Sequence, residues 1–312
     1  MNLTGKRILV TGGAGFIGSN LANALAEDNE VVAVDDGYLG TEENLTDDVE
    51  FHEVSVLDDD LPTDVDVVFH LAALSSYKMH EEERMKGAKV NVLGFINTVE
   101  QAMDDGCDTV VYASTSSIYG SQTEPSPEGM DVTVNTGYEA SKMARENYAE
   151  YLANHYGLNM AGMRFFSVYQ GYGGSEEHKG EFANVIAQFA DDLADGDAPV
   201  LFDDGTQTRD FTHVNDIVRG LVAAAEHELT GTYNLGTGEA TSFNELVEML
   251  NGELGTDIEP EYIENPIPES VYVYDTMADC SKMHEETGWE PQISLEEGVK
   301  QVCSQYMAQP PQ

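Results

Sequence analysis

The stretch TGGAGFIG at residues 11–18 follows the apolar run RILV and opens a segment with helical spacing of apolar residues, 16–28. Its glycines, Gly12, Gly15 and Gly18, permit a tight turn, close approach of the backbone to a diphosphate and close packing of helix on strand. The N-terminus of the following helix would hold the negative charge of that diphosphate. The strand, the glycine turn and the helix together predict a dinucleotide-binding βαβ unit.

An acidic residue stands where such a unit needs one. Asp35 follows Gly15 by 20 residues and ends a second Val-rich strand, 30–36. A carboxylate at that position binds the ribose hydroxyls of the dinucleotide. Asp35 and Asp36 would repel a 2′-phosphate, and no arginine comes directly after them, so we expect NAD rather than NADP. In so acidic a chain, Asp35 and Asp36 could also be two acids without a special role. The position of Asp35 at the end of the second strand argues against that interpretation.

The same alternation of strand and helix continues through the first half of the chain. Val-rich strands are expected at 66–74, 109–115 and 160–169, and helices at 90–106 and 137–157. This order predicts an α/β fold with a Rossmann-type, doubly wound parallel sheet that has helices on both faces.

From residue 170 the regular alternation of strand and helix ends. Helices are expected there at 182–196, 214–227, 243–253, 281–287 and 294–306, with a short strand at 232–236.

The charge of the chain excludes several classes of partner. Fourteen Lys and Arg against 58 Asp and Glu give a net charge of −44, which would repel nucleic acid and anionic membranes. The acids are spread along the chain, which predicts a surface adapted to a halophile's high-salt cytosol. No apolar run is long enough to span a membrane, and no secretory signal is recognisable. Cys107, Cys280 and Cys303 lie far apart, so we expect reduced thiols in the cytoplasm and no metal site.

Three side chains predict redox chemistry on a hydroxyl group. Tyr138 and Lys142 share one helix face at spacing i, i+4, and a nearby ammonium and a positive nicotinamide both favour the tyrosine phenolate. Tyr138 could then take a hydroxyl proton while hydride leaves for the nicotinamide. Thr115, at the strand end in YASTSSIYG (112–120), could donate a hydrogen bond to the reacting oxygen. Taken alone, each pattern also fits a packed tyrosine, a solvated lysine or a Ser/Thr turn.

The order TGGAGFIG, Asp35, HLAA (70–73), Asn91, STSSIYG, YEASK, RFFSVY and RDFTHVND (209–216) resembles the extended short-chain dehydrogenase/reductase superfamily. The nearest group is that of the nucleotide-sugar epimerases and dehydratases, and the resemblance covers nearly the whole chain. It implies a Rossmann domain at 1–169, to which the chain returns around 209–236, and a smaller C-terminal substrate-binding domain at 170–208 and 237–312. It also implies tightly held NAD and the roles given above to Thr115, Tyr138 and Lys142.

The resemblance also implies a set of contact residues. Those for the cofactor are Gly12, Gly15, Phe16, Ile17, Gly18, Asp35, Asp36, Leu71, Ala72, Ala73, Asn91, Tyr138, Lys142 and Phe165. Those for the substrate are Ser75, Ser117, Ser167, Lys179, Asn184, Arg209 and Tyr272. Arg209 matches the arginine that grips the substrate diphosphate, with a surface ion pair as the alternative.

A homodimer is expected through the helices at 90–106 and 137–157, where the resemblance implies a four-helix interface. Both stretches carry apolar residues beyond one core-facing stripe: Val92, Phe95, Ile96, Tyr148, Tyr151 and Leu152. An exposed apolar patch of this kind marks an interface.

Departures from the family pattern narrow the reaction. The 4,6-dehydratases carry Asp-Glu where this chain has Ser116 and Ser117, so the carboxylic acid that would eliminate water is absent and dehydration is disfavoured. The UDP-glucuronate decarboxylases also carry Glu at the position of Ser117. Ser167 replaces the family asparagine. The stretch 266–279 lacks the arginine that UDP-glucose epimerases use as a second diphosphate clamp, so either Lys179 compensates or the substrate differs. EEHKGEFANV (176–185) and YVYDTMAD (272–279) resemble the ADP-heptose 6-epimerases.

The first expectation is therefore an NAD-dependent nucleotide-sugar epimerase acting at C4 of a UDP-hexose. It would oxidise the sugar transiently to a keto-sugar and return the hydride to the opposite face. Epimerisation at another carbon, as in the ADP-heptose 6-epimerases, and a net sugar dehydrogenase that releases NADH stay open. A non-catalytic dinucleotide sensor would be expected to lack Thr115, Tyr138 or Lys142, and all three are present.

Overall fold

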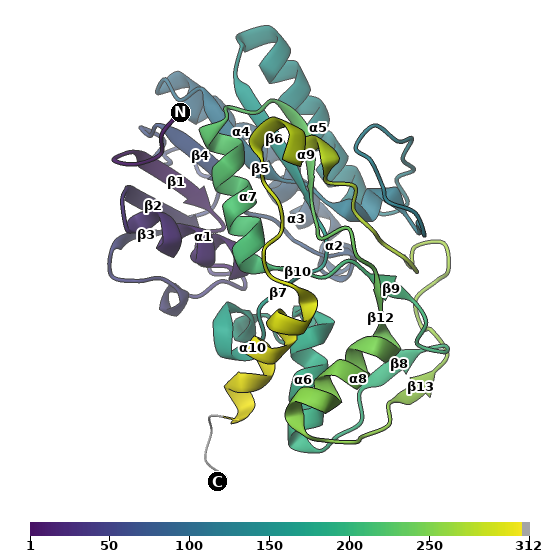
Figure 1. Ribbon diagram of the computed structural model, residues 1–312. Coiled ribbons are helices and arrows are strands. Elements are labelled where there is room, and N and C mark those ends of the chain that lie inside the picture. The colour runs from purple at the N-terminus through teal and green to yellow at the C-terminus, as the bar shows by residue number, and fades with distance from the viewer. Residues whose placement is uncertain (308–312) are drawn as a thin grey trace.

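The computed structural model describes residues 1–307 and has a large α/β part and a smaller helical part (Figure 1). The large part is built on a seven-stranded parallel sheet in the order β11-β6-β5-β4-β1-β2-β3. The strands are β1 (Arg7–Thr11), β2 (Glu30–Asp35), β3 (Val49–Glu53), β4 (Val67–His70), β5 (Thr109–Ala113), β6 (Asn159–Phe165) and β11 (Gly231–Leu235). The predicted Rossmann-type doubly wound sheet is confirmed.

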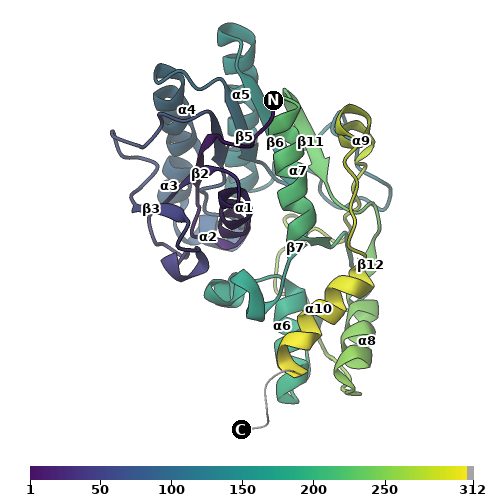
Figure 2. The ribbon, with the colours of Figure 1, turned by 60° about the vertical axis from the view of Figure 1, so that its left-hand side comes forward.

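Helices cover both faces of this sheet (Figure 2). One face packs on α1 (Phe16–Ala26) and α7 (Val214–Glu226), and the other packs on α4 (Phe95–Asp104) and α5 (Gly137–Tyr156). Successive strand residues point to opposite faces, so Val10 lies in the first core and Leu9 in the second. Because both faces are buried, the central strands are almost continuously apolar.

The strand order reverses between β1 and β4, and this is the point where such sheets bind ligands. Gly12 directly follows β1, and the loop Leu71–Ala73 directly follows β4. Gly12 has φ +67°, and a Cβ atom there would lie 2.7 Å from the backbone nitrogen of Ala72. Glycine is therefore required for the two loops to approach this closely.

The smaller part has its own apolar core between three helices, α6 (Val185–Asp195), α8 (Phe243–Leu254) and α10 (Leu295–Met307). The chain enters it after β6 and β7 (Val168–Tyr169). It returns to the Rossmann part through β10 (Thr212–His213), which pairs with β7, and through α7 and β11, and then leaves again. Its short strands pair as β8 (Val200–Phe202) with β13 (Glu261–Ile263) and as β9 (Thr208–Arg209) with β12 (Thr241–Ser242).

Several elements differ from the sequence expectation. β3, α2 (Tyr77–Glu82) and α3 (Arg84–Ala88) were not expected, and the helix predicted at 90–106 begins as a π-helical turn, Lys89–Gly94, before α4. Short helical turns also lie at Glu42–Asn44, Ser116–Tyr119, Tyr172–Glu176 and Glu177–Phe182. α9 (Ser281–Thr287) was assigned to the substrate domain, but it packs against β11, where Met283 joins the sheet core.

Two of the residues predicted to form an exposed dimer patch are not exposed. Phe95 and Leu152 are buried in the core between the sheet and α4–α5, because the apolar stripe that contains them faces the strands. The large apolar side chains exposed on these elements are Leu93, Tyr148, Tyr151 and Tyr156. Within residues 1–307, no helix has the length and apolar character needed to cross a membrane.

Candidate active site

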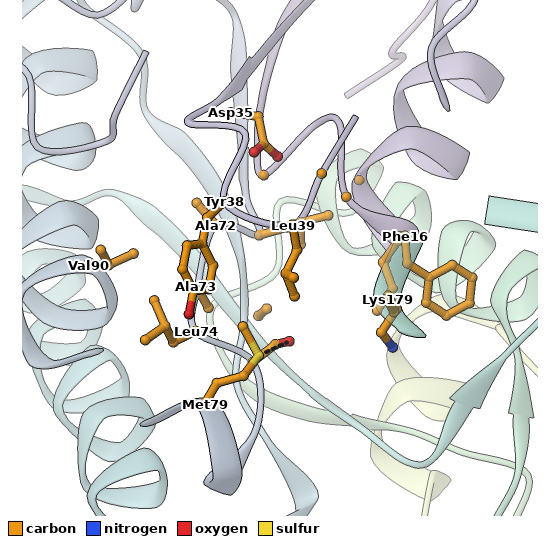
Figure 3. Close-up of a pocket in the computed structure, with 18 of the residues that line it drawn as sticks. Phe16, Asp35, Tyr38, Leu39, Ala72, Ala73, Leu74, Met79, Val90 and Lys179 are labelled. Atoms are coloured by element: carbon orange, nitrogen blue, oxygen red, sulfur yellow. Dashed lines mark hydrogen bonds between the residues drawn. The ribbon is translucent and has the colours of Figure 1, made fainter. Parts of the chain in front are cut away.

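A cavity of about 310 Å³ lies at the carboxyl ends of the central strands, between the two parts of the molecule. Figure 3 shows Asp35 at one end of it, with Phe16 and Lys179 together on one wall and Leu74, Met79 and Val90 on the wall opposite. The glycine turn, the loop after β4 and the end of β5 all contribute to its lining.

The geometry of the glycine turn fits a bound dinucleotide. Gly15 is the N-cap of α1, and no acidic residue occupies the first turn of that helix, so the N-terminal N–H groups of α1 can bind an anion in the cavity. A Cβ atom at Gly18 would lie 2.0 Å from the carbonyl oxygen of Gly12, so only glycine lets the helix start this close to the strand. The turn is thus a cradle in which a diphosphate can approach the backbone.

Asp35 is held in place at the ribose end of this cradle. Its carboxylate accepts hydrogen bonds from the backbone N–H of Ala14 (3.2 Å) and of Gly37 (3.0 Å). Burial raises the pKa of Asp35 above its ordinary value, and the Gly37 N–H opposes that shift. Asp35 lines the cavity at the end of β2, where a ribose carboxylate is expected.

Thr115, Tyr138 and Lys142 all line the same cavity. Thr115 follows β5 and caps the turn Ser116–Tyr119, where its hydroxyl accepts from the N–H of Ser117 (3.2 Å) and hydrogen-bonds the Ser117 hydroxyl (2.9 Å). Tyr138 is in the first turn of α5, which starts with a capping box. The Lys142 ammonium donates to the carbonyl oxygen of Ala113 (3.1 Å) and lies 5.7 Å from the Tyr138 ring centroid.

Burial has the largest effect on the pKa values of Tyr138 and Lys142. It raises the pKa of Tyr138, while a hydrogen bond from Thr115 and the positive charge of Arg145 act in the opposite direction. It also holds the pKa of Lys142 well below its ordinary value, and repulsion by Arg145 adds to that effect. The positive charge of Arg145 therefore favours the ionised form of Tyr138 and disfavours the charged form of Lys142.

Most of the predicted cofactor residues line the cavity, and Asn91 does not. The lining includes Gly12, Gly15, Phe16, Ile17, Gly18, Asp35, Asp36, Leu71, Ala72, Ala73, Tyr138, Lys142 and Phe165. Asn91 is buried behind it and holds the loop after β4, because its amide accepts from the N–H of Leu74 (2.8 Å) and donates to the Leu74 carbonyl (3.1 Å). Its contribution to the site is to position that loop.

The predicted substrate residues divide into two groups. Ser75, Ser167 and Lys179 line the cavity. Four others do not: Ser117, Asn184, Arg209 and Tyr272.

Local hydrogen bonds hold two of the residues outside the cavity. Asn184 caps α6 and donates to the carbonyl oxygen of Val168 (3.1 Å). Arg209 is neither at the cavity nor in a surface ion pair among the described residues, because its guanidinium donates to the carbonyl oxygens of Thr208, Val273 and Tyr274.

Several lining residues were not predicted from the sequence. Tyr38, Leu39 and Gly40 lie two to four residues after Asp36, so their place in the chain could have identified them. The others come largely from unpredicted elements or from the ends of strands: Val54, Val56, Leu74, Met79, Val90, Ala113, Ser114, Val168 and His178.

A bridging segment, residues 176–182, crosses from the smaller part of the molecule to the Rossmann part. On one side the His178 ring nitrogen hydrogen-bonds the Asn44 amide (3.1 Å), and the Lys179 ammonium lies 5.0 Å from the Phe16 ring centroid. On the other side Glu181 forms an ion pair with Lys78 on α2. The bridging segment thus ties both walls of the cavity together.

Comparison with known proteins agrees with this geometry. The model of the NAD dependent epimerase/dehydratase family matches residues 8–236. A UDP-glucose 4-epimerase of Mycolicibacterium smegmatis is 36% identical over 94% of this chain and 96% of its own length. A UDP-N-acetyl-alpha-D-glucosaminuronate decarboxylase of Bacillus cytotoxicus is 33% identical over 95% of this chain and 96% of its own.

Among solved structures, the UDP-glucose 4-epimerase of Thermotoga maritima with UDP-glucose superposes with a TM-score of 0.88. It is 32% identical, and the match covers 96% of this chain and 98% of that one. With a family model matched over most of the chain and relatives this similar along nearly their full length, the protein is an enzyme of the NAD dependent epimerase/dehydratase family, and its cofactor is NAD.

Proposed function

We propose that the enzyme is a UDP-hexose 4-epimerase. One observation carries this proposal: Thr115, Tyr138 and Lys142 meet in the NAD cavity, and no carboxylate accompanies them. Ser116 and Ser117 follow Thr115, and within residues 1–307 the acidic residues that line the cavity are Asp35 and Asp36, at the ribose end. A reaction end without a carboxylic acid suits proton removal by a tyrosine better than elimination of water.

The side chains of the cavity perform the proton chemistry of this reaction. NAD, when bound, accepts and returns a hydride. The Tyr138 oxygen takes the proton of the substrate hydroxyl and gives it back when the sugar is reduced again. Thr115, oriented by its hydrogen bonds to Ser117, donates a hydrogen bond to the reacting oxygen. The backbone of the glycine turn and the Asp35 carboxylate hold the diphosphate and the ribose of the cofactor.

The bridging segment favours an epimerase over a dehydrogenase. An epimerase must hold NADH until the hydride returns, whereas a dehydrogenase must release it in every cycle. The contacts of His178 with Asn44 and of Lys179 with Phe16 lie over the N-terminal end of α1 and the loop after β2. Release of the cofactor would require these contacts to open.

The experiment is an NMR assay in which the purified enzyme is incubated with UDP-glucose and, separately, with UDP-galactose. We expect each sugar to be converted to the other without added NAD and without accumulation of NADH. Accumulation of NADH would identify a dehydrogenase, and loss of carbon dioxide from a UDP-uronate would identify a decarboxylase. Mass spectrometry of the molecules released on denaturation names the cofactor and any retained nucleotide sugar.

A second candidate substrate is an ADP-heptose, epimerised at C6. The observation that favours it is the placement of His178 and Lys179, from the ADP-heptose-epimerase-like stretch, in the lining of the cavity. The same NMR assay with an ADP-heptose separates the two candidates.

We also propose that the enzyme acts as a cytoplasmic homodimer. A reducing cytoplasm agrees with the three free cysteines. The dimer would form through α4, α5 and the π-helical turn before α4, where Leu93 is 54% exposed and Tyr151 49% exposed. Apolar side chains this exposed on neighbouring elements are typical of an interface.

A further inference from the structure

Arg145 is a fully buried cation whose positive charge acts on Tyr138. It lies on α5 three residues after Lys142 and seven after Tyr138, so the three side chains share one helix face. Nothing in its residue type marked it as part of the site, because an arginine on a long helix is ordinarily expected at the surface.

The guanidinium of Arg145 joins three separate segments of the cavity wall. Its Nε donates to the carbonyl oxygen of Asn91 (2.5 Å), and its two Nη atoms donate to those of Ala72 (2.6 Å) and Ala113 (3.2 Å). Ala72 and Ala113 line the cavity at the ends of β4 and β5. The Lys142 ammonium donates to the same Ala113 carbonyl, so the two cations are fixed side by side.

No carboxylate neutralises this pair. Among the ion pairs of residues 1–307, none includes Arg145 or Lys142. The nearby Glu146 is occupied, because its carboxylate pairs with Arg164 (2.6 Å) and accepts from the Ser114 hydroxyl (2.5 Å). A buried cation without a counter-ion is costly unless some neighbour can supply negative charge.

Only one of the groups that face Arg145 can supply that negative charge. His70 on β4 is fully buried, and burial, Arg145 and Lys142 hold its pKa well below the ordinary value, so it is neutral. Burial raises the pKa of Tyr112 on β5 far above its ordinary value. The Phe95 ring of α4 presents only its π face, 5.8 Å from the guanidinium. The remaining group is the hydroxyl of Tyr138.

We propose that Arg145 is a positioning residue of the reaction, which fixes the ends of β4 and β5 at the cavity and supplies the permanent positive charge that stabilises the Tyr138 phenolate. Lys142 fills this role less well, because burial disfavours its charged form. A guanidinium stays charged under the same conditions, since even the buried Arg145 has a pKa of about 10.

The test compares Arg145→Met with Arg145→Lys and with the native enzyme, all loaded with NAD. The readout is the near-ultraviolet absorbance of phenolate as the pH rises, with the signal of Tyr138→Phe subtracted to isolate Tyr138. Arg145→Met should move the Tyr138 titration upward by at least ~1 pH unit, and Arg145→Lys should also move it upward, because burial disfavours the charged form of a lysine at this position. Arg84→Met, at an exposed arginine, is the matched control and should change neither titration nor rate.

The kinetic arm rests on the proposed function. For Arg145→Met we expect kcat at neutral pH to fall about tenfold for every pH unit by which the Tyr138 titration moves upward. KM should change little, and activity should return at alkaline pH. Adding Arg145→Met to Tyr138→Phe should cause no further loss, because the arginine acts through the tyrosine. The titration needs no substrate, so it stands even if the enzyme catalyses another reaction.

Two results would overturn the proposal. One is a Tyr138 titration in Arg145→Met that coincides with the native one. The other is a Tyr138 titration in Arg145→Lys that coincides with the native one, because an amine would then serve as well as the guanidinium. If Arg145→Met does not fold, Arg145→Lys decides alone: an upward shift of the Tyr138 titration supports the proposal, and a native titration refutes it.

Discussion

The hydroxyl of Tyr138 is the single atom group on which the proposed proton transfer depends. Tyr138→Phe removes it and leaves the ring beside Lys142. We expect normal folding and retained NAD, with turnover lower by at least ~10²-fold, the usual contribution of a general base. Tyr156→Phe, at an exposed tyrosine, is the control. Activity within about tenfold of native would remove Tyr138 from the mechanism.

The carboxylate of Asp35 should determine which dinucleotide the enzyme holds. Asp35→Ala removes the acceptor for the ribose hydroxyls, and hydrogen bonds to a charged group contribute about 1.5–3 kcal/mol. In a preparation stripped of cofactor, this variant should bind NAD about ten- to hundredfold more weakly and show a narrower preference over NADP. Calorimetric titration with each dinucleotide measures both. Asp36→Asn, at the exposed neighbour, should have the smaller effect, and NADP released from the native enzyme would contradict the ribose assignment.

At the scale of single elements, the exposed apolar side chains beside α4 and on α5 predict a dimer that one charge can disrupt. Leu93→Asp or Tyr151→Asp should yield a species of 34.0 kDa by light scattering in multimolar salt, where the native protein should have twice that mass. Burying an unpaired carboxylate in an apolar interface is costly, which is the reason for the expected dissociation. Tyr262→Asp, at an exposed tyrosine of β13, should leave the native mass unchanged. A native protein that is already monomeric would rule out the interface.

The elements that could be predicted from the sequence are those whose local pattern is tied to backbone geometry. The glycine turn, Asp35 and the Tyr138–Lys142 spacing follow from the βαβ unit and the helix period, so their places in the site could be foreseen. β3 could not be, because it is an edge strand of which one residue, Val49, is buried. The burial of Phe95 could not be predicted, because periodicity does not say which stripe of a helix meets the core. The burial of Arg145 could not be predicted either, because a buried charge contradicts the ordinary preference of arginine.

For the whole molecule, the charge predicts a requirement for salt. Ten of the 58 acidic side chains lie within 4.0 Å of a cationic group in the described structure, so most carboxylates have no ion-pair partner. The screening length falls from about 10 Å at ~0.1 M salt to about 3 Å at ~1 M, so repulsion between neighbouring acids is then largely removed. We propose that the protein is halophilic, and its melting temperature should rise with KCl from tenths of a molar to several molar. A flat or falling melting temperature would refute this.

The route of the chain between the two parts of the molecule has a consequence for its synthesis. A ribosome has made Tyr138 and all of α5 long before β11, whose pairing with β6 completes the sheet. Until residue 235 emerges, β6 is an open edge that can pair with a strand of another nascent chain. The smaller part waits longer still, since its core takes Val299 and Val302 from α10 at the end of the described chain. The nascent protein therefore has its catalytic side chains early and a closed active site last, and premature termination yields a chain that carries the reactive groups without the fold that uses them.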